Sequence, residues 1–221
     1  MSVMGMPLDC QRALFDLPAD VAYLNAASKS IIPRAATEAG RIGVERKAQP
    51  WRIDEPGRFV EADQVRKLFA GLICADAADI ALQPSAAYGI ATAAQNLELA
   101  PGKDILVIES QFPSNFYAWR NLAARTGNQI RTVPKPADGN WTAAVLALLD
   151  DRIGIAALPP CHWSEGTVLD LEPVAARCRK IGAAFVVDAT QWAGVMPIDV
   201  KALGVDFLVA AAYKWLLGPY R

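Results

Sequence analysis

Short apolar runs alternate with helical patterns along most of this chain, and that alternation constrains the fold more than any other feature. The apolar runs lie at residues 79–83, 104–110, 129–133, 153–158, 183–189 and 206–212. Helical patterns lie between most of them, at residues 86–97, 115–127, 142–150 and 171–182. Several runs are apolar throughout, as strands are when helices cover both faces of a sheet. The sequence therefore predicts an α/β fold with a mainly parallel sheet and right-handed crossovers.

The N-terminal part of the chain has a different pattern. Residues 17–39 read as a short extended piece, a loop with serine and proline, and a helix. After it, apolar residues such as Leu68 and Leu72 trace one face of a second helix. We expect residues 1–50 to form an N-terminal segment that is part of a small domain, and residues 51–221 to form a large domain.

The composition is that of a soluble, globular protein. Of the 221 residues, 53% are apolar, and the formal net charge is -1. This balance provides no charged surface for nucleic acid or for a membrane. The N-terminus does not resemble a secretory signal, and no apolar run approaches the roughly 18 to 20 residues of a membrane span. The four cysteines are widely spaced, so we expect reduced core residues in a cytoplasmic protein and no metal site.

Small residues follow the first predicted strand, and ligands of parallel α/β sheets bind beyond the carboxyl ends of the strands. Ser85, Ala86 and Ala87 stand where the run at residues 79–83 gives way to a helix. Open backbone N–H groups at such a helix start can hold an anion such as phosphate. The alternative is that Ser85 only caps the helix.

An aromatic residue and two polar residues follow the second predicted strand. Phe112 precedes Pro113, and Ser114 and Asn115 stand where the next helix begins. An aromatic ring in this position could cover a planar ligand, although Phe112 could equally be a core residue. Ser114 or Asn115 could be a helix cap.

Two charged residues lie at the ends of later apolar runs. Asp188 ends a fully apolar run, and Gln191 follows it. A carboxylate there is costly unless it meets a cation or several donors, which a helix N-terminus or an arginine could also provide. Lys214 lies in an apolar segment. A buried amine suits Schiff-base or proton-transfer chemistry, whereas the alternative is that its head reaches water.

Together these features describe the parts of one ligand. They provide a helix N-terminus for a phosphate, Phe112 for a flat ring, Asp188 for a ring cation and Lys214 for an aldehyde. Pyridoxal 5'-phosphate has all four parts. The sequence therefore predicts pyridoxal phosphate as the cofactor.

Four segments resemble the class V aminotransferases in order and spacing. These segments are YLNAASKSIIP, LQPSAAYGIATAAQNL, FPSNFYAW and the long stretch from residue 186 to residue 219. The family includes cysteine desulfurases, selenocysteine lyases, kynureninases and isopenicillin N epimerase. The resemblance spans nearly all of the chain and implies the three-layer large domain of fold-type I enzymes that use pyridoxal phosphate.

The resemblance also assigns roles to single residues. It makes Lys214 the catalytic lysine that forms the Schiff base, and Asp188 the partner of the pyridine nitrogen. Gln191 corresponds to a hydrogen-bond donor to the phenolic oxygen of the ring. Phe112 corresponds to the aromatic residue that stacks on the ring, and Asn115 to a further polar contact.

The remaining candidates follow from the same resemblance. The phosphate loop matches Ser85, Ala86 and Ala87, and the kynureninase tyrosine before the lysine matches Tyr213. Candidate substrate contacts are Asn25, Ala26 and His162, and a structural role is the alternative for His162. Ala211 stands where desulfurases have a serine that contacts the phosphate. Family members continue past the GP motif with another strand and a C-terminal domain, so we expect the large domain to be incomplete at its C-terminal end.

The implied activity is Cα deprotonation of an amino acid through the Lys214 Schiff base, with transamination as the expected outcome. A lyase of the cysteine desulfurase, selenocysteine lyase or kynureninase type is the first alternative, and Tyr213 and Phe112 favour the kynureninase branch. A truncated homologue without catalysis is the second. Members of the family are homodimers, so the resemblance also implies a homodimer.

Overall fold

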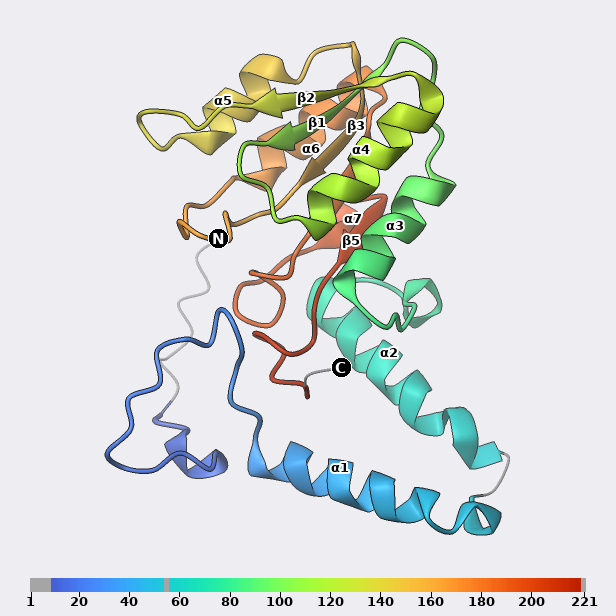
Figure 1. Cartoon of the computed structure of the whole chain (residues 1–221), viewed down its shortest axis with the longest axis vertical. Coiled ribbons are helices and arrows are strands. Elements are labelled where there is room, and N and C mark those ends of the chain that lie inside the picture. The colour runs from blue at the N-terminus through green and yellow to red at the C-terminus, as the bar shows by residue number, and fades with distance from the viewer. Residues whose placement is uncertain (1–8, 54–55, 220–221) are drawn as a thin grey trace. The chain divides into compact units, whose positions relative to one another are not determined.

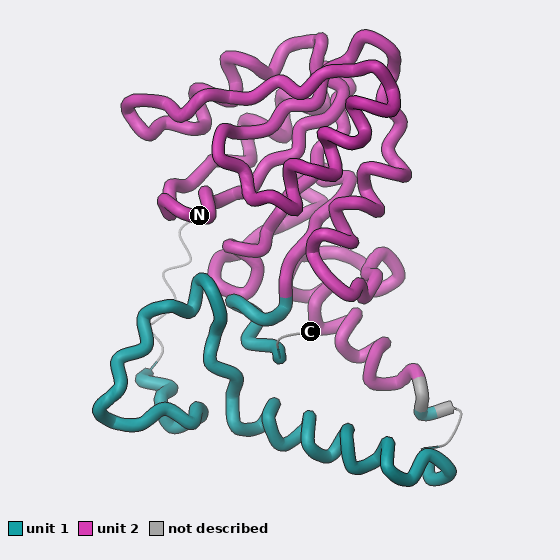
Figure 2. Tube along the Cα trace, viewed as in Figure 1, with its two compact units in different colours: residues 1–58, 212–221 teal, residues 59–211 magenta. Residues whose placement is uncertain are grey.

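The computed structural model describes residues 9–53 and 56–219. The chain divides into two compact units, which Figure 2 shows in two colours. Unit 1 consists of residues 1–58 and 212–221, and unit 2 consists of residues 59–211. The expected division of the protein into domains at residue 50 stays a prediction.

Unit 2 is built on a five-stranded sheet in the order β2-β1-β3-β4-β5. Its strands are β1 (Asp104–Ile108), β2 (Gln129–Val133), β3 (Ile153–Leu158), β4 (Ala184–Asp188) and β5 (Phe207–Val209). Every neighbouring pair is parallel. The expected mainly parallel α/β sheet is therefore confirmed.

Helices cover both faces of this sheet (Figure 1). They are α3 (Ala86–Asn96) and α4 (Ser114–Thr126) on one face, and α5 (Trp141–Leu148), α6 (Leu171–Ile181) and α7 (Val200–Leu203) on the other. Along β1, Ile105 packs towards α3 and α4, whereas Leu106 packs towards α5 and α6. Successive side chains of a strand point to opposite faces, so a strand buried on both sides must be apolar throughout.

The expected strand at residues 79–83 is wrong. A 3-10 helix, η4 (Ala77–Asp79), occupies its start, and the backbone is extended at Ile80. Within the part of the chain that the structure describes, no segment pairs with residues 80–83. Extended backbone becomes a strand only when a neighbour takes its hydrogen bonds. The expected run at residues 206–212 is also longer than β5, whose pairing with β4 begins at Phe207 and ends at Val209.

Helix α2 (Val60–Ile73) carries the expected apolar stripe but leaves it largely uncovered. Leu68 is 64% exposed and Leu72 is 55% exposed. Only Ala70 and Ile73 of this helix are buried. The periodicity therefore located the helix correctly, whereas most of its apolar face is open in the described chain.

Unit 1 contains one long helix, α1 (Arg34–Lys47), in which no residue is buried. Its short 3-10 helices are η1 (Arg12–Leu14) and η2 (Pro50–Arg52), and a further one, η3 (Pro56–Phe59), runs to the boundary with unit 2. Across residues 9–53 and 56–219, we find no helix with both the length and the apolar character needed to cross a bilayer.

Candidate active site

The carboxyl ends of the strands in unit 2 bring several candidate residues to one edge of the sheet. Because all five strands are parallel, the segments that follow β1, β3 and β4 leave at the same edge. These segments carry Phe112, His162 and Gln191, and Asp188 itself ends β4. The order β2-β1-β3 reverses direction between β1 and β3, and such switch points open the crevices in which α/β proteins bind ligands.

Asp188 is the buried carboxylate of this edge. It is 7% exposed, and its Oδ1 accepts a hydrogen bond from the backbone N–H of Thr190 at 3.1 Å. The Thr190 hydroxyl in turn accepts the N–H of Ala211 at 3.3 Å, which joins the segments after β4 and β5. Gln191 is partly buried beside them in sequence. A buried carboxylate held in this way suits a cationic ligand atom.

Helix α3 begins with an N-terminus that fits an anion. Ser85 is the N-cap, and its hydroxyl accepts the N–H of Tyr88 at 3.1 Å, so the capping interpretation of Ser85 is confirmed. The first turn has no acidic residue. The N–H groups of Ala86 and Ala87 lie in this turn, where helical backbone donors have no partner within the helix. The capping role of Ser85 is therefore compatible with the expected anion site, which stays a prediction.

A close contact sets α3 against the end of β5. A methyl group added at Gly89 would lie 3.0 Å from Cγ1 of Val209, so only glycine allows this approach without movement of the neighbour. Val209 is the register partner of Asp188 in the β4–β5 pair. Gly89 lies one turn after Ser85. The start of α3 and the Asp188 carboxylate therefore belong to the same edge of the sheet.

Phe112 is not a core residue. Its side chain is 37% exposed. Its backbone N–H donates to Oε1 of Gln111 at 3.3 Å, and Nε2 of Gln111 donates to the carbonyl of Ala157 in β3 at 3.2 Å. The segment after β1 is thereby tied to the neighbouring strand, and Phe112 is held beside the switch point.

Asn115 is a buried amide rather than a helix cap. The N-cap of α4 is Pro113, which has no side-chain capping hydrogen bond, so the cap position belongs to neither Ser114 nor Asn115. Asn115 is fully buried, and its Oδ1 accepts the indole N–H of Trp119 at 2.9 Å. Its Nδ2 is buried without a hydrogen-bond partner. An orphaned buried donor is costly, so this amide is a candidate contact for a polar ligand atom.

His162 has the surroundings of a structural residue. It is 2% exposed, and its ring stacks on Trp141 with 5.4 Å between centroids. Its Nε2 lies 3.4 Å from the carbonyl of Glu109, and its Nδ1 lies 3.3 Å from the Ser164 hydroxyl. This geometry favours the structural alternative over contact with a substrate.

Trp163 is a residue of this edge that sequence reasoning missed. Its indole N–H donates to the carbonyl of Ser110 at 2.8 Å. Its ring meets Phe112 edge to face, with 5.4 Å between centroids and an interplanar angle of 82°. A loop tryptophan belongs to no periodic pattern. Its place next to the only histidine was the one available signal.

Two ionisable groups of the same loop have shifted pKa values. A hydrogen bond from Lys135, with Nζ 2.6 Å from Oε1, lowers the pKa of Glu165. Burial raises the pKa of the Cys161 thiol. The loop therefore presents an ionised carboxylate that is paired at the surface, and a protonated thiol.

Lys214 and Tyr213 lie in unit 1 and are described within it. Lys214 is 6% exposed, which argues against the interpretation that its head reaches water. Its Nζ lies 5.9 Å from the centre of the Tyr213 ring. The backbone N–H and the hydroxyl of Ser30 both donate to the carbonyl of Tyr213, at 3.2 and 3.1 Å. The peptide that leads into the lysine is therefore held by the N-terminal segment.

Asn25 and Ala26 form part of a turn in the same unit. The carbonyl of Asn25 accepts the N–H groups of Ser28 and Lys29, each at 3.1 Å. Asn25 is exposed and Ala26 is partly buried. Their proposed contact with a substrate stays a prediction.

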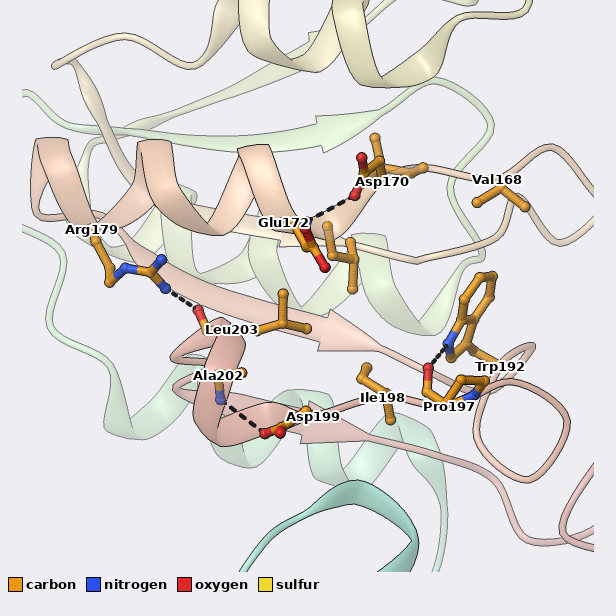
Figure 3. Close-up of a pocket in the computed structure, with 12 residues that line it drawn as sticks. Val168, Asp170, Glu172, Arg179, Trp192, Pro197, Ile198, Asp199, Ala202 and Leu203 are labelled. Carbon is orange, nitrogen blue, oxygen red and sulfur yellow. Dashed lines mark hydrogen bonds between the residues drawn. The ribbon is translucent and has the colours of Figure 1, made fainter. Parts of the chain in front are cut away.

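A pocket of about 470 Å³ opens elsewhere in unit 2 (Figure 3). It lies between the start of α6, helix α7 and the segment after β4, and Trp192 forms part of its wall. Its carboxylates Asp170 and Asp199 accept N–H groups as the N-caps of α6 and α7. Because none of the predicted cofactor residues lines it, this pocket is separate from the candidate site. Across the described part of the chain, no cluster of three His, Cys, Asp or Glu residues could hold a metal ion.

Comparisons with known proteins identify the family. The family model described as Aminotransferase class-V matches residues 58–220. An uncharacterized aminotransferase, YcbU of Bacillus subtilis (strain 168), is 31% identical over 159 residues, which are 69% of this chain and 40% of the relative. A cysteine desulfurase of Yersinia pestis (strain Pestoides F) is 34% identical over 122 residues, which are 55% of this chain and 30% of the relative. The chain thus spans less than half of the length of these relatives.

Solved structures share the fold. A C-DES mutant with glycine covalently linked to the PLP-cofactor has a TM-score of 0.85 at 24% identity, over 95% of this chain and 57% of its own. The cysteine desulfurase CsdA from Escherichia coli has a TM-score of 0.81 at 25% identity, over 94% of this chain and 54% of its own. These likenesses agree with the parallel sheet of unit 2 and with its helical layers.

Proposed function

Because the chain belongs to the class V aminotransferase family, we propose that it is part of a pyridoxal phosphate-dependent enzyme that acts on an amino acid. The observation that carries this proposal is Asp188, a buried carboxylate at the end of β4 and at the same sheet edge as the start of α3. When bound, the cofactor supplies an aldehyde that condenses with amines and a ring that withdraws electrons from the substrate α-carbon.

The residues of unit 2 fit the chemistry of this cofactor. The first turn of α3 presents backbone N–H groups that have no partner within the helix, and it has no acidic residue, which suits a phosphate. Asp188 suits a protonated ring nitrogen, because a buried carboxylate is stabilised by a cationic donor. The partly exposed ring of Phe112 suits the face of a flat ring. Asn115 adds a buried amide donor without a partner.

The proposed roles divide between binding and proton transfer. Lys214 Nζ is the amine on which the cofactor is held, and once released it takes the proton from the substrate α-carbon. Asp188 keeps the ring nitrogen protonated, and this fixed charge stabilises electron density that develops in the ring. Gln191 donates to the phenolic oxygen, and Tyr213 is the neighbour of the lysine.

Transamination is the proposed reaction, and a lyase activity is the alternative. Support for a cysteine desulfurase comes from the relative in Yersinia pestis, and support for the kynureninase branch comes from Tyr213 and Phe112. Incubation with an amino acid separates these outcomes. Keto acid formation supports transamination, alanine and sulfur released from cysteine support a desulfurase, and alanine with anthranilate from kynurenine supports a kynureninase.

We also propose a homodimer in the cytoplasm. The family resemblance supports the dimer, and the exposed apolar stripe of α2 is a surface that a second copy could cover. All four cysteines are free, which agrees with a reducing compartment. Sedimentation velocity of the purified chain tests whether it forms a dimer. If the chain sediments as a monomer throughout the micromolar concentration range, the proposed homodimer is refuted for this chain.

The decisive experiment is borohydride reduction in the presence of pyridoxal phosphate, followed by mass spectrometry of tryptic peptides. We expect a pyridoxyl adduct on the Lys214 peptide in the wild type and no such adduct in Lys214→Ala. Lys201→Ala is the matched control, because Lys201 is an exposed lysine paired with Asp76 at 2.7 Å. Absence of a specific adduct in a folded wild-type chain would favour the homologue without catalysis.

Asp188→Asn gives a second and independent test of the cofactor site. The substitution keeps the shape of the side chain and removes its charge. We expect the affinity for pyridoxal phosphate to fall about 10- to 100-fold, since a hydrogen bond to a charged group contributes about 1.5 to 3 kcal/mol. Equal affinities of the variant and the wild type in an absorbance titration would contradict the role of Asp188.

A further inference from the structure

The loop at residues 161–168 is closed at its base and anchored in the core of unit 2. Backbone pairing between Cys161 and Val168 closes the loop, and the N–H of His162 donates to the carbonyl of Thr167 at 2.9 Å. The His162 ring is buried against Trp141 of α5, which holds the base of the loop in the core. The next residue, Trp163, is therefore carried on a rigid base.

Trp163 contacts two positions of the segment after β1. Its N–H donates to the carbonyl of Ser110 at 2.8 Å, and its ring edge meets Phe112 at 5.4 Å between centroids. Ser110 has a φ of 54°, a left-handed conformation that is unusual for a residue other than glycine. The hydrogen bond fixes the plane of the indole, and the edge contact then restricts the Phe112 ring.

We propose that Trp163 is a positioning residue that holds Phe112 in the orientation in which its ring covers the cofactor. This inference rests on the proposed function, because it assumes that Phe112 stacks on pyridoxal phosphate. Phe112 and Trp163 follow β1 and β3, the two strands between which the sheet reverses direction. An aromatic pair that spans this switch point stands where a bound ring is expected.

Exposure separates this role from ordinary core packing. Trp163 is 44% exposed and Phe112 is 37% exposed, so neither ring fills the interior of unit 2. A partly exposed phenylalanine can turn about its side-chain bonds, and the rotamers that do not face the cofactor lower the affinity for it. Removal of Trp163 should therefore weaken cofactor binding more than it weakens folding.

The test measures cofactor binding and not turnover. Pyridoxal phosphate is titrated into the wild-type chain, Trp163→Ala, Trp163→Phe, Phe112→Ala and the double variant, and the visible circular dichroism of the bound cofactor reports the orientation of its ring. The matched control is Tyr117→Ala. Tyr117 is a half-exposed aromatic residue of α4 that also meets a neighbour edge to face, Phe116 at 5.6 Å.

We expect Trp163→Ala to bind pyridoxal phosphate about three- to ten-fold more weakly, the range of an aromatic edge contact, with an altered dichroism band. Trp163→Phe keeps a ring but loses the bond to Ser110, and we expect it to lie between Trp163→Ala and the wild type. In the Phe112→Ala background, loss of Trp163 should change nothing further, because the two residues act through one contact. Tyr117→Ala should match the wild type.

Wild-type affinity and dichroism in Trp163→Ala, alongside weakened binding in Phe112→Ala, would overturn the positioning role and leave the proposed function standing. Independent effects of the two substitutions in the double variant would overturn it as well. If Trp163→Ala lowers the melting temperature of the cofactor-free chain without changing cofactor affinity, the residue is structural only. A wild-type chain that binds no pyridoxal phosphate refutes the proposed function, and the positioning role with it.

Discussion

Helices α2 and α6 carry the same kind of apolar stripe, yet only α6 buries it. In α6, Leu171, Val174 and Cys178 all lie in the core beneath the sheet. In α2, Leu68 and Leu72 face outward and are more than half exposed. The periodicity of apolar residues thus identifies which face of a helix can be buried, but it does not identify the surface that packs against that face.

Connectivity explains the difference between the two helices. Helix α6 joins β3 to β4, which are parallel neighbours, so its crossover must pack on the sheet. Helix α2 precedes the first strand of the sheet, and no crossover ties it to a face. The chain connectivity therefore does not require the apolar stripe of α2 to pack on the sheet, and burial of this stripe would need a different surface.

The largest expected effect on stability comes from a charged residue on the buried face of α6. Val174→Asp should lower the free energy of unfolding by about 3 to 5 kcal/mol, because Val174 is fully buried and an unpaired carboxylate there finds no compensating charge. Urea unfolding followed by far-ultraviolet circular dichroism measures the change. A loss below about 1 kcal/mol would show that α6 is not packed as described.

The second prediction compares two cysteines at these helices. Burial, with a further contribution from Asp206, raises the pKa of Cys178 in α6 to about 12. Cys74, which caps the end of α2, is exposed. At pH 8 we expect iodoacetamide to alkylate Cys74 at least 100-fold faster than Cys178, since the thiolate is the nucleophile. Peptide mass mapping over time gives both rates, and equal rates would mean that α6 opens readily.

The third prediction concerns stability at high pH. An unfolded chain releases the Cys178 proton above pH about 9, whereas the folded chain keeps it until about pH 12. The unfolded state therefore binds fewer protons in this window, so stability falls as pH rises, by at most about 1.4 kcal/mol per pH unit. Cys178→Ala should remove this slope while leaving a constant difference below pH 8. Parallel curves for the wild type and the variant up to pH 11 would contradict the buried thiol.

The smallest expected effect is on α2 itself. Leu68→Asp should change the free energy of unfolding of the monomer by no more than about 0.5 kcal/mol, because Leu68 is 64% exposed. If α2 lies in a dimer interface, the same substitution should instead shift sedimentation velocity profiles towards the monomer. If Leu68→Asp lowered the free energy of unfolding of the monomer as much as Val174→Asp does, the apolar stripe of α2 would have to be as buried as that of α6.

Local signals predicted several parts of the candidate site correctly. A serine directly before a helical pattern predicts an N-cap, and Ser85 caps α3. An apolar run that ends in a carboxylate predicts the end of a buried strand, and Asp188 is the last residue of β4. The strand expected at residues 79–83 was wrong, since pairing depends on a neighbour and not on the run itself. Asn115 was expected to be a helix cap or a polar contact to the cofactor. It is buried instead of capping, and its side-chain oxygen accepts the indole N–H of Trp119 one turn later.

The sequence by itself determined the parallel sheet, the helices between its strands and the positions of Asp188, Ser85 and Phe112 along the chain, because these follow from periodicity and from local backbone chemistry. The tertiary structure alone decided that Trp163 meets Phe112 and that the stripe of α2 stays open. Both outcomes depend on which segments lie side by side once β1 and β3 become neighbours and α2 does not join the sheet. Contacts between distant segments leave no period in the sequence, so only the folded chain reveals them.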